Sequence, residues 1–374
     1  MAAPWSGPFV KHRDDAFLLA AALAYGFGVP LLFAFAALRH VRGGGKLDLM
    51  ACYVYHVLRV GPFFMNFAMV YTLCHKEGHA TAARRSLWRQ TRGPLPQLFN
   101  WWAGMFYGVL PSSFAVGHSL NHHRYDNAAS DVVTTADKPR DSKLALLCYL
   151  PRFGMYTTNL STTWQFARER NWRVALATAA GTVYYSAFVG FVAWRIGWNF
   201  ALSYLGYPLL EQTLLLSGVN WTWHAFVDPT NPGSSPFVES VTIVQGRINV
   251  LQEDSHVVHH QYPGAHWAEH PRLLLKHGKG YDLASLFCKT HVFELLGLIL
   301  LRDYEKLANR YVGHLPPNGA EAAAGGARLL PDHGAVAALL RARLRTCTWG
   351  LRASQTPHWA AVARKAEKQL RDHR

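Results

Sequence analysis

The chain has 374 residues, of which half are hydrophobic and only 16% are charged, and its formal net charge is +15. A disulfide framework and a zinc ribbon are not expected, because the five cysteines are scattered and form no CxxC pair. The basic charge suits an anionic lipid surface or an acidic partner. We expect no nucleic acid, because the basic residues flank apolar runs and no recognition motif is present.

The first two apolar runs, residues 16–38 and 47–73, are each predicted to cross a membrane, which takes roughly 20 apolar residues. The second run carries Arg59, which we interpret as lining the protein interior or snorkelling, in preference to a lipid head-group contact. A third apolar run comprises residues 98–116. If it crossed the membrane, the histidines before it and the histidines after it would lie on opposite faces of the bilayer. We therefore expect this run to be re-entrant or interfacial.

Two further apolar runs, residues 174–194 and 200–221, complete the predicted spans. The sequence therefore predicts an all-α, membrane-embedded helical bundle of about four transmembrane helices, with interfacial helices and a cytosolic histidine-rich cap. The Arg- and Lys-rich segment 76–173 agrees with a cytosolic cap, since positive loops stay inside. The basic RHVRGGGK loop after the first span is predicted outside and disagrees with the same rule.

After about residue 313 the composition changes, so we divide the chain into a membrane domain, residues 1–313, and a C-terminal segment, residues 314–374. That segment begins as an Ala-, Gly- and Pro-rich linker and ends as a basic tail. Residues 334–349 are predicted to form a basic amphipathic helix, either free or on the membrane surface. We expect the tail to regulate or target the protein and not to catalyse.

Histidines gather in four short motifs, HKEGH, HSLNHH, NWTWH and HVVHH, each at the polar end of an apolar run. Positions i and i+4 share a helix face, so each motif can direct two side chains at one point. A single HxxxH is weak evidence, but two HxxHH-type motifs in one chain are improbable by chance. The candidate metal ligands are His75, His79, His118, His122, His123, Asn220, His224, His256, His259 and His260.

Metal binding explains these clusters best, because packed neutral imidazoles in an apolar region each need a partner. Nine imidazoles exceed the ligands of one ion, so we expect two ions. Imidazole accepts zinc, copper, iron and nickel alike. Iron with dioxygen fits a membrane site best, because it can attack an unactivated C–H bond and redox-silent zinc cannot.

The motifs resemble those of the membrane fatty acid desaturase family, whose boxes read HX3-4H, HX2-3HH and [H/Q]X2-3HH on a four-span scaffold. The resemblance covers about residues 15–300 and includes Asn220 and His224 at the end of the fourth span, and Pro263 after the last box. It implies a di-iron centre that activates O2 and removes hydrogens from a lipid acyl chain. Nine histidines would bind the iron directly and Asn220 would act through a water.

Acidic residues near the boxes are expected to hydrogen-bond the free ring nitrogens of the ligands and fix their orientation, although each could equally be a solvated charge. They are Glu77, Asp126, Asp131, Glu253 and Asp254. The resemblance also implies a tunnel for the acyl chain. Four tryptophans are candidates for its lining, and packing of these residues against lipid is an equal alternative. The tryptophans concerned are Trp101, Trp102, Trp221 and Trp223.

The implied reaction consumes electrons, but the chain has neither the His-Pro-Gly-Gly signature of a fused haem domain nor a dinucleotide fingerprint. A separate electron donor is therefore expected, of the cytochrome b5 type or a ferredoxin, both typically acidic. We expect a multi-pass integral membrane protein, in the endoplasmic reticulum if the source is eukaryotic or in a plastid membrane.

Three alternatives remain at this point. A lipid hydroxylase or related oxygenase would use the same ligands. A membrane metal transporter should hold its ligands near the bilayer midplane on broken helices, whereas these motifs lie at span ends. An inactive scaffold would have little reason to keep the complete set of nine histidines.

Overall fold

The computed structural model describes residues 9–233, 235–278, 281–315, 330, 332–350 and 353–372. Within them the chain is mostly helical, which confirms the all-α prediction. Two short strands, β1 (Thr242–Val244) and β2 (Leu286–Cys288), pair in parallel with Ile243 opposite Phe287. The chain forms two compact units: unit 1 comprises residues 1–121 and 153–214, and unit 2 comprises residues 122–152 and 215–374.

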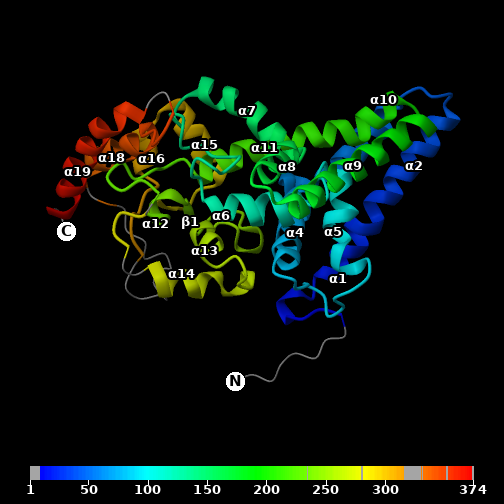
Figure 1. The fold of residues 1–374 in the computed structure, drawn as a ribbon, viewed down its shortest axis with the longest axis horizontal. Coiled ribbons are helices and arrows are strands. Elements are labelled where there is room, and N and C mark those ends of the chain that lie inside the picture. Colours follow the sequence, from blue (N-terminus) through cyan, green and yellow to red (C-terminus); the bar gives the residue numbers. More distant parts are fainter. Residues whose placement is uncertain are drawn as a thin grey trace. The chain divides into compact units, whose positions relative to one another are not determined.

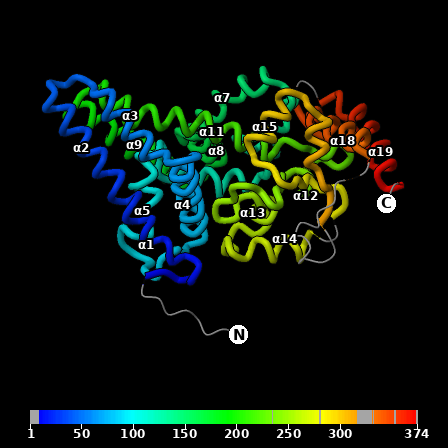
Figure 2. Tube along the Cα trace, turned by 180° about the vertical axis from the view of Figure 1, so that it is seen from behind, coloured from blue at the N-terminus to red at the C-terminus, as the bar shows by residue number. Residues whose placement is uncertain are grey.

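Unit 1 contains most of the long apolar helices. In chain order its elements are η1 (Arg13–Asp15), α1 (Leu18–Ala21), η2 (Ala22–Gly28), α2 (Val29–Arg42), α3 (Leu49–Val60), η3 (Pro62–Phe64), α4 (Met65–Ala82), η4 (Leu95–Gln97), α5 (Leu98–Trp101), η5 (Ala103–Tyr107), η6 (Ser113–His122), α8 (Leu160–Arg168), α9 (Trp172–Arg195), α10 (Trp198–Ala201), η7 (Leu202–Gly206) and the first part of α11 (Tyr207–Trp223). Figure 2 shows α2, α3 and α4 as neighbours.

Two of the predicted spans are helices long and apolar enough to cross a membrane, Arg13–Arg42 and α9. The predicted span 47–73 is broken, because α3 ends at Gly61, whose φ is +72°, and Pro62 follows. α3 and α4 are bent by 41° at this break and would give a third span only as a pair. The run 200–221 does not meet the same test, so four spans are not confirmed.

The run 98–116 is broken into α5, η5 and the start of η6, all too short to cross a bilayer. Gly108 ends η5 with a φ of +81°, and a Cβ there would lie 2.5 Å from the backbone of Leu209. Only glycine fits this turn. This interruption agrees with the expectation that the run does not cross.

α9 packs against the turn before η6 through a glycine. A Cβ on Gly181 would lie 1.9 Å from the carbonyl oxygen of Pro111, whereas a Cβ on Gly190 of the same helix would meet nothing within 4 Å.

We expect Gly181→Ala to lower the free energy of unfolding by about 3 kcal/mol, at the upper end for overpacking, because a backbone atom cannot move aside as a side chain can. Gly190→Ala is the matched control and should be neutral or slightly stabilising. Thermal unfolding of both variants in detergent measures the difference. Equal midpoints for the two would show that this helix contact is absent.

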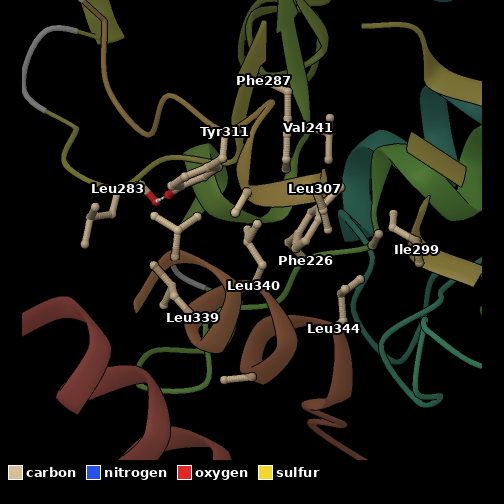
Figure 3. Close-up of a cluster of buried hydrophobic side chains, with 14 of the residues drawn as sticks. Phe226, Val241, Leu283, Phe287, Ile299, Leu307, Tyr311, Leu339, Leu340 and Leu344 are labelled. Atoms are coloured by element: carbon tan, nitrogen blue, oxygen red, sulfur yellow. Dashed lines mark hydrogen bonds between the residues drawn. The ribbon is translucent and has the colours of Figure 1, made fainter. Parts of the chain in front are cut away.

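Unit 2 is built around a buried apolar cluster that includes Phe226, Phe287, Leu339 and Leu340 (Figure 3). Its elements are α6 (His123–Tyr125), the first part of α7 (Lys143–Thr157), the end of α11, α12 (Pro236–Glu239), β1, η8 (Val250–Gln252), α13 (His256–Gln261), η9 (Trp267–Glu269), α14 (His270–Gly278), β2, α15 (Val292–Leu301), α16 (Tyr304–Ala308), α18 (His333–Arg345), η10 (Ala353–Gln355) and α19 (Thr356–Asp372). α18 and α19 lie side by side (Figure 1).

The predicted tail helix 334–349 corresponds to α18. It is not free, and its apolar side packs in the core of unit 2 instead of on a membrane surface. Leu339 and Leu340 are fully buried, and even Arg343 is 1% exposed. The Arg343 guanidinium donates to the carbonyl of Leu283 at 2.7 Å, and Arg140 donates back to the carbonyl of Arg343 at 2.7 Å. Residues 316–329, most of the predicted linker, lie outside the described residues, and the domain boundary at residue 313 stays a prediction.

Candidate metal centre

Three histidines of unit 1 converge. His75 and His79 lie one turn apart on α4 and are buried, and His118 lies on η6. The Nε2 atoms of His75 and His118 are 2.7 Å apart, and those of His75 and His79 are 3.2 Å apart. A Cβ on Gly78 would lie 2.5 Å from the Phe114 side chain, so this glycine permits the close approach of α4 and η6.

Glu77, between the two α4 histidines, does not face them. Its carboxylate accepts hydrogen bonds from the backbone N–H of Asn100 at 2.6 Å and of Phe99 at 3.3 Å, and so anchors the start of α5. The reason is helical geometry, since position i+2 points away from position i.

A polar partner of His79 is Ser119, which the sequence pattern did not single out. Its hydroxyl donates to the carbonyl of Phe114 at 2.9 Å and lies 3.1 Å from Nδ1 of His79. With that hydroxyl proton committed to Phe114, Ser119 accepts from Nδ1–H of His79. This tautomer leaves Nε2 of His79 as the metal-binding nitrogen.

Six histidines of unit 2 also gather. His256, His259 and His260 come from α13, His122 and His123 from the junction of η6 and α6, and His224 from the end of α11. Ring nitrogens of His122, His224 and His260 lie within 4.8 Å of one another. Nε2 of His256 is 3.2 Å from Nε2 of His224, and Nε2 of His123 is 2.9 Å from Nε2 of His259.

Two of the predicted acidic residues, Asp131 and Asp126, lie beside histidine rings. Asp131 is 2.7 Å from Nδ1 of His122 and is held by the backbone N–H groups of Asn127 and Val133. Burial opposes the charged form of His122, but the Asp131 carboxylate outweighs it and raises the pKa of His122. Asp126 lies 3.0 Å from Nδ1 of His260. Partial burial raises the pKa of Asp126, but the hydrogen bond and charge of His260 outweigh it and hold the pKa of Asp126 well below the usual range.

The other two predicted acids, Glu253 and Asp254, are buried directly before α13. One carboxylate oxygen of Asp254 is buried and has no hydrogen-bond partner among the described residues. Burial, and after it the charge of Glu253, raises the pKa of Asp254 to about 7. No described hydrogen bond joins Asp254 to a histidine ring, whereas a backbone group, the carbonyl of Glu239, lies 3.2 Å from Nδ1 of His224.

Asn220 is held by a tyrosine that the sequence did not single out. The amide nitrogen of Asn220 donates to the hydroxyl of Tyr149 at 2.8 Å and to the carbonyl of Val133 at 3.2 Å. Tyr149 itself is fully buried, and its hydroxyl donates to the same Val133 carbonyl at 2.8 Å. The side chain of Asn220 is therefore fixed through its nitrogen, with its oxygen left for another partner.

We expect Tyr149→Phe to lower turnover and metal affinity by about tenfold without unfolding the protein, because supporting residues of metal ligands contribute about that much. Tyr281→Phe, at a partly exposed tyrosine of the same unit, is the control. Metal titration of both variants gives the result. Unchanged metal affinity in Tyr149→Phe would remove Tyr149 from the support of the site.

The predicted tryptophans divide between packing and the site. Trp221 is fully buried and donates its indole N–H to the carbonyl of Arg140 at 2.9 Å, and Trp102 donates to the carbonyl of Gly26 at 2.7 Å. Trp223 stacks on His256, with the ring centroids 4.3 Å apart. Trp101 packs on Tyr184. A tunnel lined by these rings stays a prediction.

The histidine groups fit a metal. Burial lowers the pKa of both His224 and His260, which keeps them in the neutral form that binds metal. Nε2 of His260 is buried and makes no hydrogen bond among the described residues. A buried ring nitrogen without a partner, among converging imidazoles, is what a metal ligand requires.

The sequence model of the fatty acid desaturase family matches residues 50–286, more than half of the chain. The chain belongs to the fatty acid desaturase family. All ten predicted ligands lie within the matched residues. No curated protein and no solved structure matches the chain significantly.

Membership in the fatty acid desaturase family confirms the resemblance drawn from the histidine boxes and supports an oxidoreductase of lipid metabolism. It brings a lipid acyl substrate and a membrane setting with it. It does not separate the double-bond-forming members from the hydroxylases, which use the same boxes.

Proposed function

We propose that the chain is an O2-dependent desaturase that introduces a double bond into a lipid acyl chain at a di-iron centre. The observation that carries the proposal is the complete histidine set in a member of the fatty acid desaturase family, with ring nitrogens converging in each unit. The ligands would be His75, His79, His118, His122, His123, His224, His256, His259 and His260, with Asn220 acting through a water.

Two iron ions would supply the oxidising power needed to break unactivated C–H bonds. In the overall reaction the acyl chain loses two hydrogens and O2 is reduced to two waters. The donor delivers two electrons, and two protons come from solvent. Because no electron-carrying group is recognisable in the sequence, the electrons would come from a separate donor of the cytochrome b5 type or a ferredoxin. The net charge of +15 favours an acidic donor.

The chain's own residues would orient the ligands. Ser119 and Asp131 lie at Nδ1 of His79 and His122, and Asp126 lies at Nδ1 of His260. A partner at Nδ1 fixes the imidazole plane and leaves Nε2 for the metal. In this way three polar side chains would set the direction of three ligands before any metal binds.

The membrane would deliver the lipid substrate. We propose a multi-pass integral membrane protein of the endoplasmic reticulum, or of a plastid membrane, in which the apolar Arg13–Arg42 run and α9 cross the bilayer. The exposed tryptophans Trp172 and Trp194 lie at the two ends of α9, which is the usual position of aromatic residues at membrane interfaces.

The main rival is a lipid hydroxylase with the same ligands, since the outcome depends on how tightly the substrate radical is held. Expression in yeast, followed by mass spectrometry of total acyl chains, separates the two. A new acyl species lighter by two hydrogens, absent when His259→Ala is expressed, supports the desaturase. A species heavier by one oxygen would replace this proposal with the hydroxylase.

A further inference from the structure

Unit 2 contains a cavity of about 480 Å³ that none of the histidine ligands lines. It lies between the segment before α7, the end of α15, the end of α18 and the start of α19, and its walls include Asp141, Ser142, Arg302, Arg345, His358 and Trp359. Cavities of this size hold small organic molecules. Its walls are made largely by the C-terminal helices, to which the proposed function assigns no role.

The cavity carries unbalanced positive charge. Asp141 is the one carboxylate among its lining residues, and it is buried. Nε of Arg345 donates to its Oδ2 at 2.6 Å, and the hydroxyl of Tyr304 donates to the same oxygen. Arg302 is 3.9 Å from that carboxylate and donates its Nε to the Asp141 backbone carbonyl at 3.0 Å. One carboxylate thus faces two guanidinium groups.

The guanidinium of Arg302 has terminal nitrogens that its described hydrogen bond does not use. Its side chain is 53% exposed, and the hydrogen bond described for it uses Nε, so its terminal nitrogens are available to a ligand. The adjacent acid, Asp303, is paired with Lys306 at 2.9 Å and does not neutralise it. A guanidinium whose terminal nitrogens are accessible binds a carboxylate or phosphate through two parallel hydrogen bonds, in a bidentate pair.

Two long helices add partial positive charge at the same place. α7 begins directly after Ser142, whose hydroxyl accepts from the backbone N–H of Ala145 at 3.3 Å, and α19 begins at Thr356 between lining residues. Helix N-termini favour anions. Trp359 gives the cavity an aromatic wall, with the Arg345 guanidinium 5.8 Å from its ring centroid and the His358 ring 4.8 Å away.

We propose that this cavity binds a phosphate ester, with Arg302 as the main contact of the phosphate and Trp359 packing on the organic part. The open guanidinium beside two helix N-termini selects an oxyanion, and the volume and aromatic wall leave room for more than inorganic phosphate. The same chemistry occurs in a soluble phosphate ester and in the head group of an anionic phospholipid. The site is separate from the proposed function and does not depend on it.

The test uses the full-length protein in detergent and glycerol 3-phosphate as the soluble probe, with sodium chloride at equal ionic strength as the screen for non-specific charge effects. A ligand that binds only the folded state raises the unfolding midpoint in a saturable way. Arg302→Gln removes the phosphate contact at an exposed position. Arg272→Gln, an exposed arginine of the same unit paired with Glu269, is the matched control for the lost charge.

A second arm uses nanodiscs of phosphatidylcholine with and without phosphatidic acid. We expect saturable stabilisation of the wild type and of Arg272→Gln, and apparent affinity about tenfold weaker in Arg302→Gln. Stabilisation by glycerol 3-phosphate assigns a soluble ester, and stabilisation by phosphatidic acid alone assigns a lipid head group. No stabilisation in either arm, or equal affinities in the two variants, overturns the proposal.

Discussion

His259→Ala is expected to abolish turnover and to lower bound iron from about two ions per chain, while leaving the protein folded. His259 is 1% exposed, and its Nε2 lies 2.9 Å from Nε2 of His123. Removing one of a small set of ligands leaves the remaining imidazoles with an incomplete coordination shell, so the affinity for the metal falls. Without the metal, the C–H bond of the lipid cannot be attacked.

The measurement is metal content by elemental analysis, together with acyl-chain analysis, on protein purified in mild detergent. His333→Ala is the matched control, because His333 is an exposed histidine of the same unit at the start of α18. It should keep both iron and activity. Zinc in the wild type, or an active His259→Ala protein, would overturn the ligand assignment and the oxygenase proposal with it.

Leu340→Ala is expected to lower the free energy of unfolding of unit 2 by about 2–5 kcal/mol, the range for truncating a fully buried leucine. Leu340 is fully buried in the cluster shared by α18, β2 and α16. The loss combines the transfer free energy of the removed carbons with the cavity that they leave. An effect of this size is a large fraction of the stability of an ordinary domain.

Leu301→Ala provides the comparison, because Leu301 is a leucine of the same unit with 69% of its surface exposed. Its removal should change the unfolding midpoint by little. Thermal unfolding, or the yield of monodisperse protein after solubilisation, reports the difference. If Leu340→Ala behaved like Leu301→Ala, α18 would be a peripheral helix, as the sequence alone had indicated.

The histidine boxes were predictable because their logic is local. His75 and His79 share a helix face by spacing alone, and Asp131 lies beside His122, nine positions from it. Asp126 is not a local case, because it lies beside His260 of a different box. The broken α3–α4 pair was also readable, since Gly61 and Pro62 stand at the break, but hydropathy outweighed these two residues in the prediction.

The parts that sequence could not supply depend on long-range contacts. Ser119 orients His79 from a different helix, and Tyr149 holds Asn220 from 71 positions away. Ser119 stands inside the HSLNHH motif, but the spacing does not reveal that it faces His79, and Tyr149 stands in no recognised motif. The burial of α18 was hidden because its arginines suggest a solvent-exposed face, whereas Arg343 is satisfied by the Leu283 carbonyl, 60 positions distant.

The place of α18 in the core also determines when unit 2 can complete its fold during synthesis. The apolar helices of unit 1 leave the ribosome early, but the cluster around Phe226 and Phe287 lacks a wall until α18 emerges more than a hundred residues after Phe226. Domains fold as units during synthesis. Unit 2 must therefore wait, with apolar surface exposed, while the earlier helices are already in place.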